Sequence, residues 1–248
     1  MELQLALSGI VVGALSGFFG IGGGTILVPI LLFFGLDMKA AVGISVVQMV
    51  FSSIFGSVIN HRRGTLDITL VLYIGIGGFL GAISSAYLVK TFSSWTLEAI
   101  FFLFVMIALM RLYFKNIEHN EIQRKVHPLL LVGLGSLLGM FSIAVGVGGS
   151  VLLVPLLVGF LHVKLKNAIS AGLFFVVFSS IAGLMSLGYV GMIDYTNGII
   201  VGVASLGGVY MGIWLKHQSS DALQKRLLIV FYIIISLYLL YRLVTAHG

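Results

Sequence analysis

Two glycine-rich stretches are the strongest candidates for a ligand-binding site in this sequence. Residues 20–25 read Gly-Ile-Gly-Gly-Gly-Thr, and residues 146–150 read Gly-Val-Gly-Gly-Ser, 126 positions later. Each glycine weakens a helix by roughly 1 kcal/mol relative to alanine, so we expect a helix break at both stretches. The N–H groups in the first turn of a helix are unpaired and partly positive, and they bind anions without a charged side chain. The segments that begin at Thr25 and Val151 would each offer such a turn to a small anion.

Neutral side chains on neighbouring apolar segments could add hydrogen-bond donors. Gln48 is the most polar side chain deep in its segment, and Ser52 and Ser179 occupy matching positions in the two halves. Serines often bond to their own helix and glycines often serve only close packing, so both alternatives stay open. The sign of the local field is also open, because the carbonyl end of the preceding segment meets the same glycines. The candidate substrate-binding residues are Gly20, Gly22, Gly23, Gly24, Thr25, Gln48, Ser52, Gly146, Gly148, Gly149, Ser150 and Ser179.

Other kinds of chemistry find little support in the sequence. The chain has no cysteine, no His-Glu-x-x-His zinc motif, and no lysine after the glycines as in a phosphate-binding loop. All eight Asp and Glu residues fall near the ends of apolar segments, so an intramembrane hydrolase or a carboxylate proton relay has no candidate. We therefore expect no metal, no cofactor and no enzymatic activity.

The composition places this chain in a lipid bilayer. Hydrophobic residues make up 59% and charged residues only 9%, whereas soluble domains carry about 25% charged residues. The net charge of +6 comes from basic residues that sit singly or in pairs at segment ends, which is typical of membrane spans rather than of nucleic-acid binding. The N-terminus lacks the basic region of a signal peptide, so we expect the first apolar segment to be retained.

Ten apolar segments make up two similar halves. The Phe-Ser-Ser-Ile motif at 51–54 recurs at 178–181, and the Val-Pro pair at 28–29 recurs at 154–155. We predict an all-α polytopic membrane protein of two repeats with four to five membrane segments each, each repeat starting with a glycine-broken hairpin. The repeats are residues 1–114 and 129–248, joined by a polar cytoplasmic linker, 115–128. The expected segments are 3–19, 25–36, 40–59, 66–89, 95–114, 129–145, 151–161, 167–188, 195–215 and 224–243.

The distribution of lysine and arginine favours halves of opposite orientation. If the first two segments of each half were fused into one span, the basic residues would divide seven to seven between the faces. If these segments form a hairpin that enters and leaves on one side, the halves are inverted and the division is eleven to three. The excess of basic residues in cytoplasmic loops selects the second arrangement and places both termini outside. Inverted repeats with broken helices at matching positions are typical of secondary transporters.

The glycine stretches, the Val-Pro pairs and the duplication together resemble the TauE/SafE sulfite exporter family over the full length of the chain. The second copy departs from the first at Ala144 and Val145, which replace Phe18 and Phe19, and at Ser150, which replaces Gly24. The resemblance implies outward transport of sulfite, sulfoacetate or a related organosulfonate across the cytoplasmic membrane.

A small anion and the lipid bilayer are the expected partners, homo-oligomers are compatible with the sequence, and nucleic acid is not expected. Because the interior of a cell is negative, each anion that leaves gains about 2.3 kcal/mol per 100 mV, so we expect facilitated, potential-driven export. The alternatives are a channel or permease for another small solute, or an importer of a sulfur compound.

Overall fold

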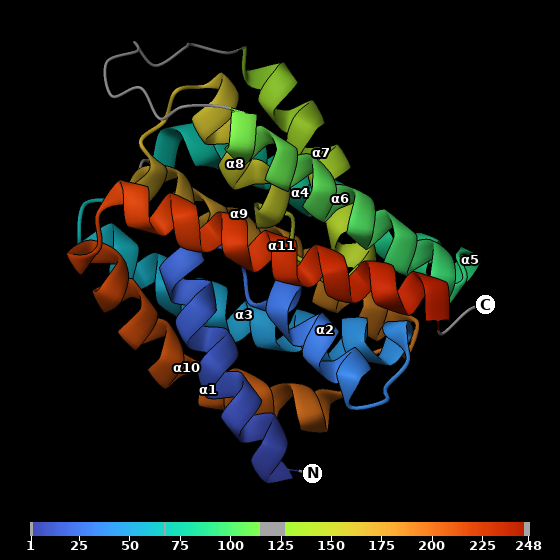
Figure 1. The fold of residues 1–248 in the computed structure, drawn as a ribbon. Helices are drawn as coiled ribbons and strands as arrows, with labels where there is room; N and C mark the ends of the chain where they lie inside the picture. Colours follow the sequence, from blue (N-terminus) through green and yellow to red (C-terminus); the bar gives the residue numbers. More distant parts are fainter. Residues whose placement is uncertain (1, 67, 115–126, 246–248) are drawn as a thin grey trace.

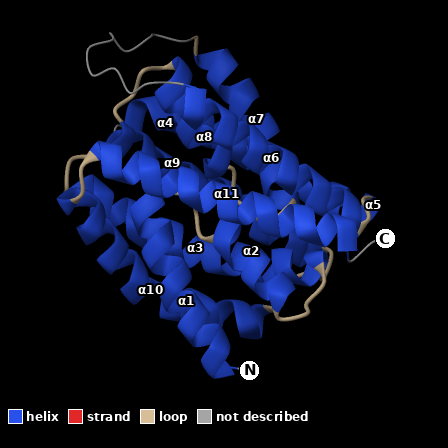
Figure 2. Ribbon diagram, viewed as in Figure 1, coloured by secondary structure: helices blue, strands red, loops and turns tan. Residues whose placement is uncertain are grey.

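The fold is built from helices joined by short connections (Figure 2). The structure is a computed structural model that describes residues 2–66, 68–114 and 127–245, and these contain no strand. The helices are α1 (Glu2–Phe19), α2 (Gly24–Phe33), α3 (Met38–Arg62), α4 (Ile68–Ile83), α5 (Ser85–Thr91), α6 (Ser94–Phe114), α7 (Pro128–Ala144), α8 (Ser150–Phe160), α9 (Leu165–Tyr189), α10 (Tyr195–Gln218) and α11 (Asp221–Thr245).

The helices follow the expected apolar segments with one difference. The segment expected at 66–89 forms two helices, α4 and α5, because the chain turns at Ser84. Six stretches are long and apolar enough to cross a membrane, and α1, α2, α7 and α8 are shorter apolar helices. Large apolar side chains such as Leu80, Met185 and Leu237 are exposed on the outside, where only lipid would cover them favourably. The chain is therefore a multi-pass membrane protein.

Glycines interrupt the helical structure between α1 and α2 and between α7 and α8. Gly22 and Gly23 adopt φ of +74°, and Gly148 and Gly149 adopt φ of +76° and +88°. Residues with a Cβ rarely take these angles, so the sequence stops each helix here and reverses the chain. The two predicted helix breaks are confirmed. Below, the first glycine loop means residues 20–23 and the second glycine loop means residues 145–149.

The first helix of each half packs against the fourth helical segment of the other half. Helix α1 lies along α10 and α7 lies along α4, in the lower and upper parts of Figure 1. A Cβ built on Gly13 would come within 2.1 Å of the Ser205 carbonyl oxygen, and one on Gly81 within 1.9 Å of the Ser136 oxygen. Only glycine permits such approach of two main chains, which is how membrane helices gain packing contact.

The contacts also give the directions of the helices. Gly43, Gly198 and Gly202 bring α3 and the start of α10 together in the same order along both helices, so these two run parallel. Helix α3 runs opposite to its counterpart α9, because Gly56 lies against Leu173 while Asn60, one turn later, lies near Ser170. The centre of the fold is thus a pair of oppositely directed, matching helices, with a glycine loop packed on each.

Aspartate side chains cap the starts of α10 and α3. Asp194 accepts a hydrogen bond from the Asn197 N–H at 3.0 Å. Asp37 caps α3 in the same way through the Ala40 N–H at 3.1 Å. Asp67 and residues 115–126 of the expected linker lie outside the described residues.

Candidate functional site

The two glycine loops meet in the middle of the fold. A Cβ on Gly24 would lie 1.9 Å from the carbonyl oxygen of Gly146, and one on Gly22 would lie 3.3 Å from the Ser150 hydroxyl. The structure therefore brings together two stretches that are 126 positions apart, each at the start of a short helix. Residues 16–29 and 142–151 are buried, so the loops meet in a site closed to solvent.

Main-chain N–H groups at this meeting point have unused bonding capacity. Within the described residues, the N–H groups of Gly22, Gly23, Gly148 and Gly149 donate to no main-chain carbonyl. They stand at or just before the positive ends of α2 and α8. A buried N–H without a partner costs free energy, and a bound anion is one partner that would remove this cost.

Gln48 is the polar side chain that lies closest to the first glycine loop. It extends from α3, has no exposed surface, and neither its amide nitrogen nor its amide oxygen has a partner in the described structure. A Cβ on Gly23 would lie 2.3 Å from the Gln48 Oε1 atom, so the amide lies directly on the loop. The hydroxyls of Ser150, Ser16 and Ser142, which surround the two loops, are also buried and unpaired. Several buried hydrogen-bond donors without acceptors therefore lie close together, which is uncommon in the interior of a native protein.

The other predicted side chains make local bonds. Thr25 and Ser52 donate to carbonyls of their own segments, Ile21 at 3.2 Å and Met49 at 3.3 Å. Ser179 donates to the Gly148 carbonyl at 2.9 Å and so holds the second glycine loop against α9. These hydroxyls still lie beside the loops, but they donate to carbonyl groups of the protein itself.

One residue outside the predicted set also holds the loops. Ser45 donates to the Gly146 carbonyl at 3.0 Å, which ties α3 of the first half to the glycine loop of the second. Its spacing from Gln48, one helical turn, was the available signal, because it places both side chains on one face of the helix.

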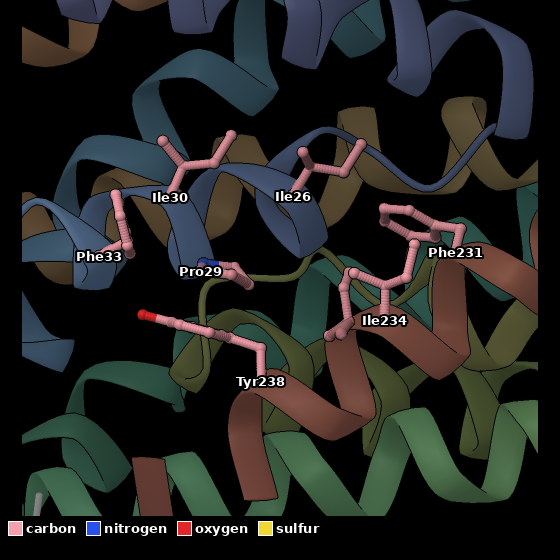
Figure 3. A pocket seen from close by; sticks show the side chains of 8 residues that line it. Ile26, Pro29, Ile30, Phe33, Phe231, Ile234 and Tyr238 are labelled. Atoms are coloured by element: carbon pink, nitrogen blue, oxygen red, sulfur yellow. The ribbon is translucent and has the colours of Figure 1, made fainter. Parts of the chain in front are cut away.

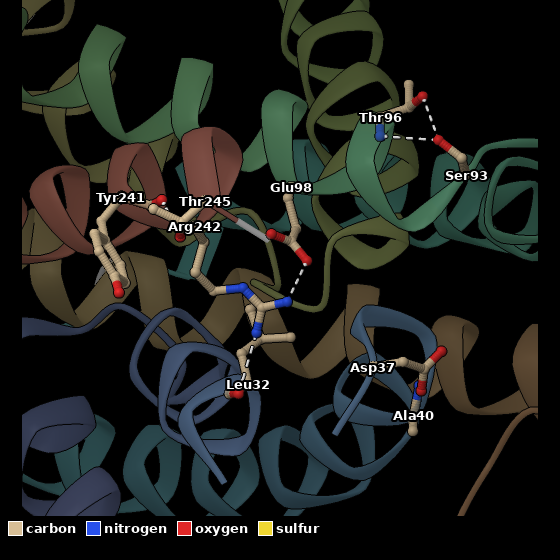
Figure 4. A network of polar contacts seen from close by, with 9 residues as sticks. All are labelled: Leu32, Asp37, Ala40, Ser93, Thr96, Glu98, Tyr241, Arg242 and Thr245. Atoms are coloured by element: carbon tan, nitrogen blue, oxygen red, sulfur yellow. Dashed lines mark hydrogen bonds and ion pairs between the residues drawn. The ribbon is translucent and has the colours of Figure 1, made fainter. Parts of the chain in front are cut away.

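The sequence reasoning missed two cations that lie inside the fold, the partly buried Arg242 and the buried Lys216, because it treated lysine and arginine only as flanks of membrane spans. Arg242 forms an ion pair at 3.0 Å with Glu98, whose side chain is fully buried, and donates to the Leu32 carbonyl at the end of α2 (Figure 4). Lys216 is fully buried too, and it bonds Asn60 and Ser170. Neither position could be recognised from sequence, since burial of a helix end depends on which helices pack around it.

A groove between α2 and α11 has a different character. It is lined by Ile26, Pro29, Ile30, Phe33 and residues of α11, among them Phe231 and Tyr238 (Figure 3). These side chains offer almost no donor for an anion, so the groove is a poor candidate for the anion site.

Comparison with known proteins assigns the chain to a family. The family model described as Sulfite exporter TauE/SafE matches residues 5–239. The chain belongs to this family. A probable membrane transporter protein of Methanocaldococcus jannaschii is 28% identical over 239 residues, covering 87% of this chain and 86% of the relative. YdhB of Bacillus subtilis, also named a probable membrane transporter protein, is 23% identical over 209 residues, 81% of this chain and 84% of the relative.

A third probable membrane transporter protein, from Haemophilus influenzae, is 28% identical over 228 residues, which cover 83% of this chain and 82% of the relative. No solved structure matches the chain. This TauE/SafE family member is therefore a membrane transporter and not an enzyme.

Proposed function

We propose that the protein carries a small sulfur-containing oxyanion, such as sulfite, sulfoacetate or a related organosulfonate, out of the cell across the cytoplasmic membrane. The anion is held between the two glycine loops by main-chain N–H groups and the Gln48 amide. The observation that carries this proposal is the gathering of unpaired N–H groups, the unpaired Gln48 amide and the Ser150 hydroxyl at two helix starts. The name of the family supports the class of substrate.

We further propose that the two halves are inverted, with the glycine hairpins reaching in from opposite faces. The opposite directions of α3 and α9 support this arrangement, as does the clustering of ion-pair and polar contacts at two ends. Lys166, Asp221 and Lys216 lie at one end, which is cytoplasmic in this arrangement, and Arg242 and Glu98 lie at the other. Cysteine labelling tests the topology directly, because the natural chain has no cysteine. Leu3→Cys should react with an impermeant maleimide outside the cell and Gln218→Cys only after permeabilisation.

Outward movement along the membrane potential needs no coupling proton. Within the described residues, no carboxylate lies among the groups that meet at the glycine loops, and the buried Glu98 is engaged by Arg242 away from them. Transport that requires a pH gradient and ignores the membrane potential would contradict this mechanism.

The decisive experiment is transport by the purified protein in liposomes. The panel is sulfite, sulfoacetate, thiosulfate, sulfate and taurine, with electrical current recorded together with flux. We expect flux and current with sulfite or sulfoacetate, and loss of both in Gly149→Leu, whose side chain would overlap the Phe175 ring. A channel for a neutral solute would give flux without current. A Gly149→Leu protein with normal flux would remove the glycine loops from the site.

A further inference from the structure

A buried polar cluster surrounds Lys216 near the end of α10. The Lys216 ammonium donates to the Asn60 Oδ1 atom at 2.6 Å and to the Ser170 hydroxyl at 3.0 Å. The Thr65 hydroxyl lies 2.9 Å from the same serine, and the Gln224 Nε2 atom donates to the Lys216 carbonyl. Four separate parts of the chain therefore converge on one lysine.

No carboxylate compensates this lysine within the described part of the chain. Its two side-chain partners are neutral, and the charged groups that act on it, Arg63 and Lys166, are also positive. Lys166 has its own acidic neighbour, Asp221, at 3.9 Å. Three basic side chains therefore lie at this end of the fold, and within the described residues the ion pair that they form is the one between Lys166 and Asp221.

A purely structural role explains this arrangement poorly. Lysines near the ends of membrane helices usually extend to water, whereas the Lys216 side chain has no exposed surface. A buried cation is costly unless it is paired, and a well-packed apolar residue would serve the fold better. The amide nitrogen of Asn60 is also buried, and it has no hydrogen-bond partner in the described structure.

A buried polar face of α3 joins this cluster to the glycine loops. Gln48, Ser52, Gly56 and Asn60 are buried and follow one another at helical spacing along one side of the helix. The twelve residues from Gln48 to Asn60 span roughly 18 Å at 1.5 Å per residue.

The matching face of α9 is largely apolar. Phe175, Ser179, Gly183 and Leu187 stand at the positions that correspond to Gln48, Ser52, Gly56 and Asn60. Val89 corresponds to Lys216. The two faces share a serine and a glycine, but the amides of Gln48 and Asn60 have apolar counterparts in the second half.

We propose that Lys216 and Asn60 form a second binding site for a small oxyanion, between the aqueous face that carries Arg63 and the glycine loops. An anion that arrives at this face is attracted by the positive cluster, binds at Lys216, and then moves along the polar face of α3 to the central site. The inference rests on the proposed function, since it uses the same anion, but it adds a separate site with its own residues.

Equilibrium binding of radiolabelled sulfite to the purified, detergent-solubilised full chain tests this proposal. We expect two bound ions per wild-type chain, and one in either Lys216→Met or Gln48→Leu. Lys216→Arg keeps the charge and should keep both ions. Lys164→Met is the matched control, because it removes an exposed lysine at the start of α9 near the same end, and it should bind two. Elution as a single symmetric species confirms that each variant is folded.

The outcomes separate the two proposals. If Lys216→Met stays folded and binds as many ions as the wild type with the same Kd, the second site is wrong while the central site stands. If ions are lost only in Lys216→Met and not in Gln48→Leu, the second site stands and the central one is wrong. If Lys216→Met fails to fold, Asn60→Leu replaces it and should raise the Kd of one ion about tenfold. A wild-type chain that binds no sulfite overturns both.

Discussion

The two glycine hairpins, α1–α2 and α7–α8, share a main-chain design but differ in the side chains around them. Both place left-handed glycines at a buried reversal, and both leave a serine hydroxyl unpaired in the preceding turn, Ser16 and Ser142. The first loop faces the amide of Gln48, whereas the second faces the ring of Phe175 at the corresponding position. Duplication thus preserved the main-chain course of the two loops, while the amide of Gln48 has no counterpart in the second half. A substrate between the loops would meet an asymmetric site despite the symmetric backbone.

The hairpins also differ in how the rest of the chain holds them. Arg242 of α11 donates to the Leu32 carbonyl at the end of α2 at 3.1 Å. In the second hairpin α11 instead uses Tyr232, which donates to the Val151 carbonyl at the start of α8 at 3.3 Å. The first hairpin is anchored at its far end by a charged group and the second near its glycines by a neutral one. Displacing the two hairpins would therefore break different contacts.

The largest effect is expected from Arg242→Met. This change removes the anchor of α2 and leaves the buried Glu98 carboxylate without its ion-pair partner. Breaking a buried pair by removing one member costs about 3–5 kcal/mol, so the unfolding temperature in detergent should fall by many degrees. The double variant Arg242→Met with Glu98→Met removes both charges and should recover most of the loss. Recovery of less than half would mean that Arg242 acts mainly through Leu32.

Some features of the two hairpins could be predicted from the sequence, and others could not. The helix breaks, the duplication and the all-helical membrane fold were predictable, because glycine angles, apolar length and motif spacing are local properties. Residues within the site could be named, but their partners could not. Ser179 and Ser52 look equivalent in sequence, yet one bonds the glycine loop and the other its own helix. The break at Ser84 and the burial of Glu98 and Lys216 also depend on tertiary packing, which no single segment encodes.

Gly24→Ala should have the next largest effect. The second hairpin has a serine, Ser150, at the position that corresponds to Gly24. A Cβ at position 24 would lie 1.9 Å from the Gly146 carbonyl oxygen, a main-chain atom that cannot turn away. Overpacking costs about 1–3 kcal/mol, and we expect the upper end together with near-complete loss of anion flux in liposomes. Gly133→Ala is the control, since it lies on α7 with open space around it and should leave both stability and flux unchanged. Normal flux in Gly24→Ala would show that the loops do not need to touch.

Gln48→Leu tests the asymmetry between the loops. A hydrogen bond to a charged group contributes about 1.5–3 kcal/mol, so loss of the amide should weaken anion binding about 10- to 100-fold. The folded protein should become no less stable, because the buried amide has no partner to lose. Phe175→Leu, the matching change at the second loop, should alter the Kd by less than threefold. Equal losses in the two variants would mean that the anion makes no specific use of the Gln48 amide.

The smallest expected effects are the losses of stability on replacing two serines of α3, Ser45 and Ser52. Ser45→Ala removes a bond from the first half to the Gly146 carbonyl, whereas Ser52→Ala removes only a bond to the Met49 carbonyl of its own helix. A carbonyl in a glycine loop has no helical partner to fall back on, so Ser45→Ala should cost about 1 kcal/mol of stability. Ser52→Ala should cost less than half of that, because the Met49 carbonyl lies inside a helix that can still satisfy it. Thermal unfolding in the same detergent measures both. If Ser52→Ala proves the more costly change, the buried polar face of α3 contributes more to stability than the bond from Ser45 to the second glycine loop.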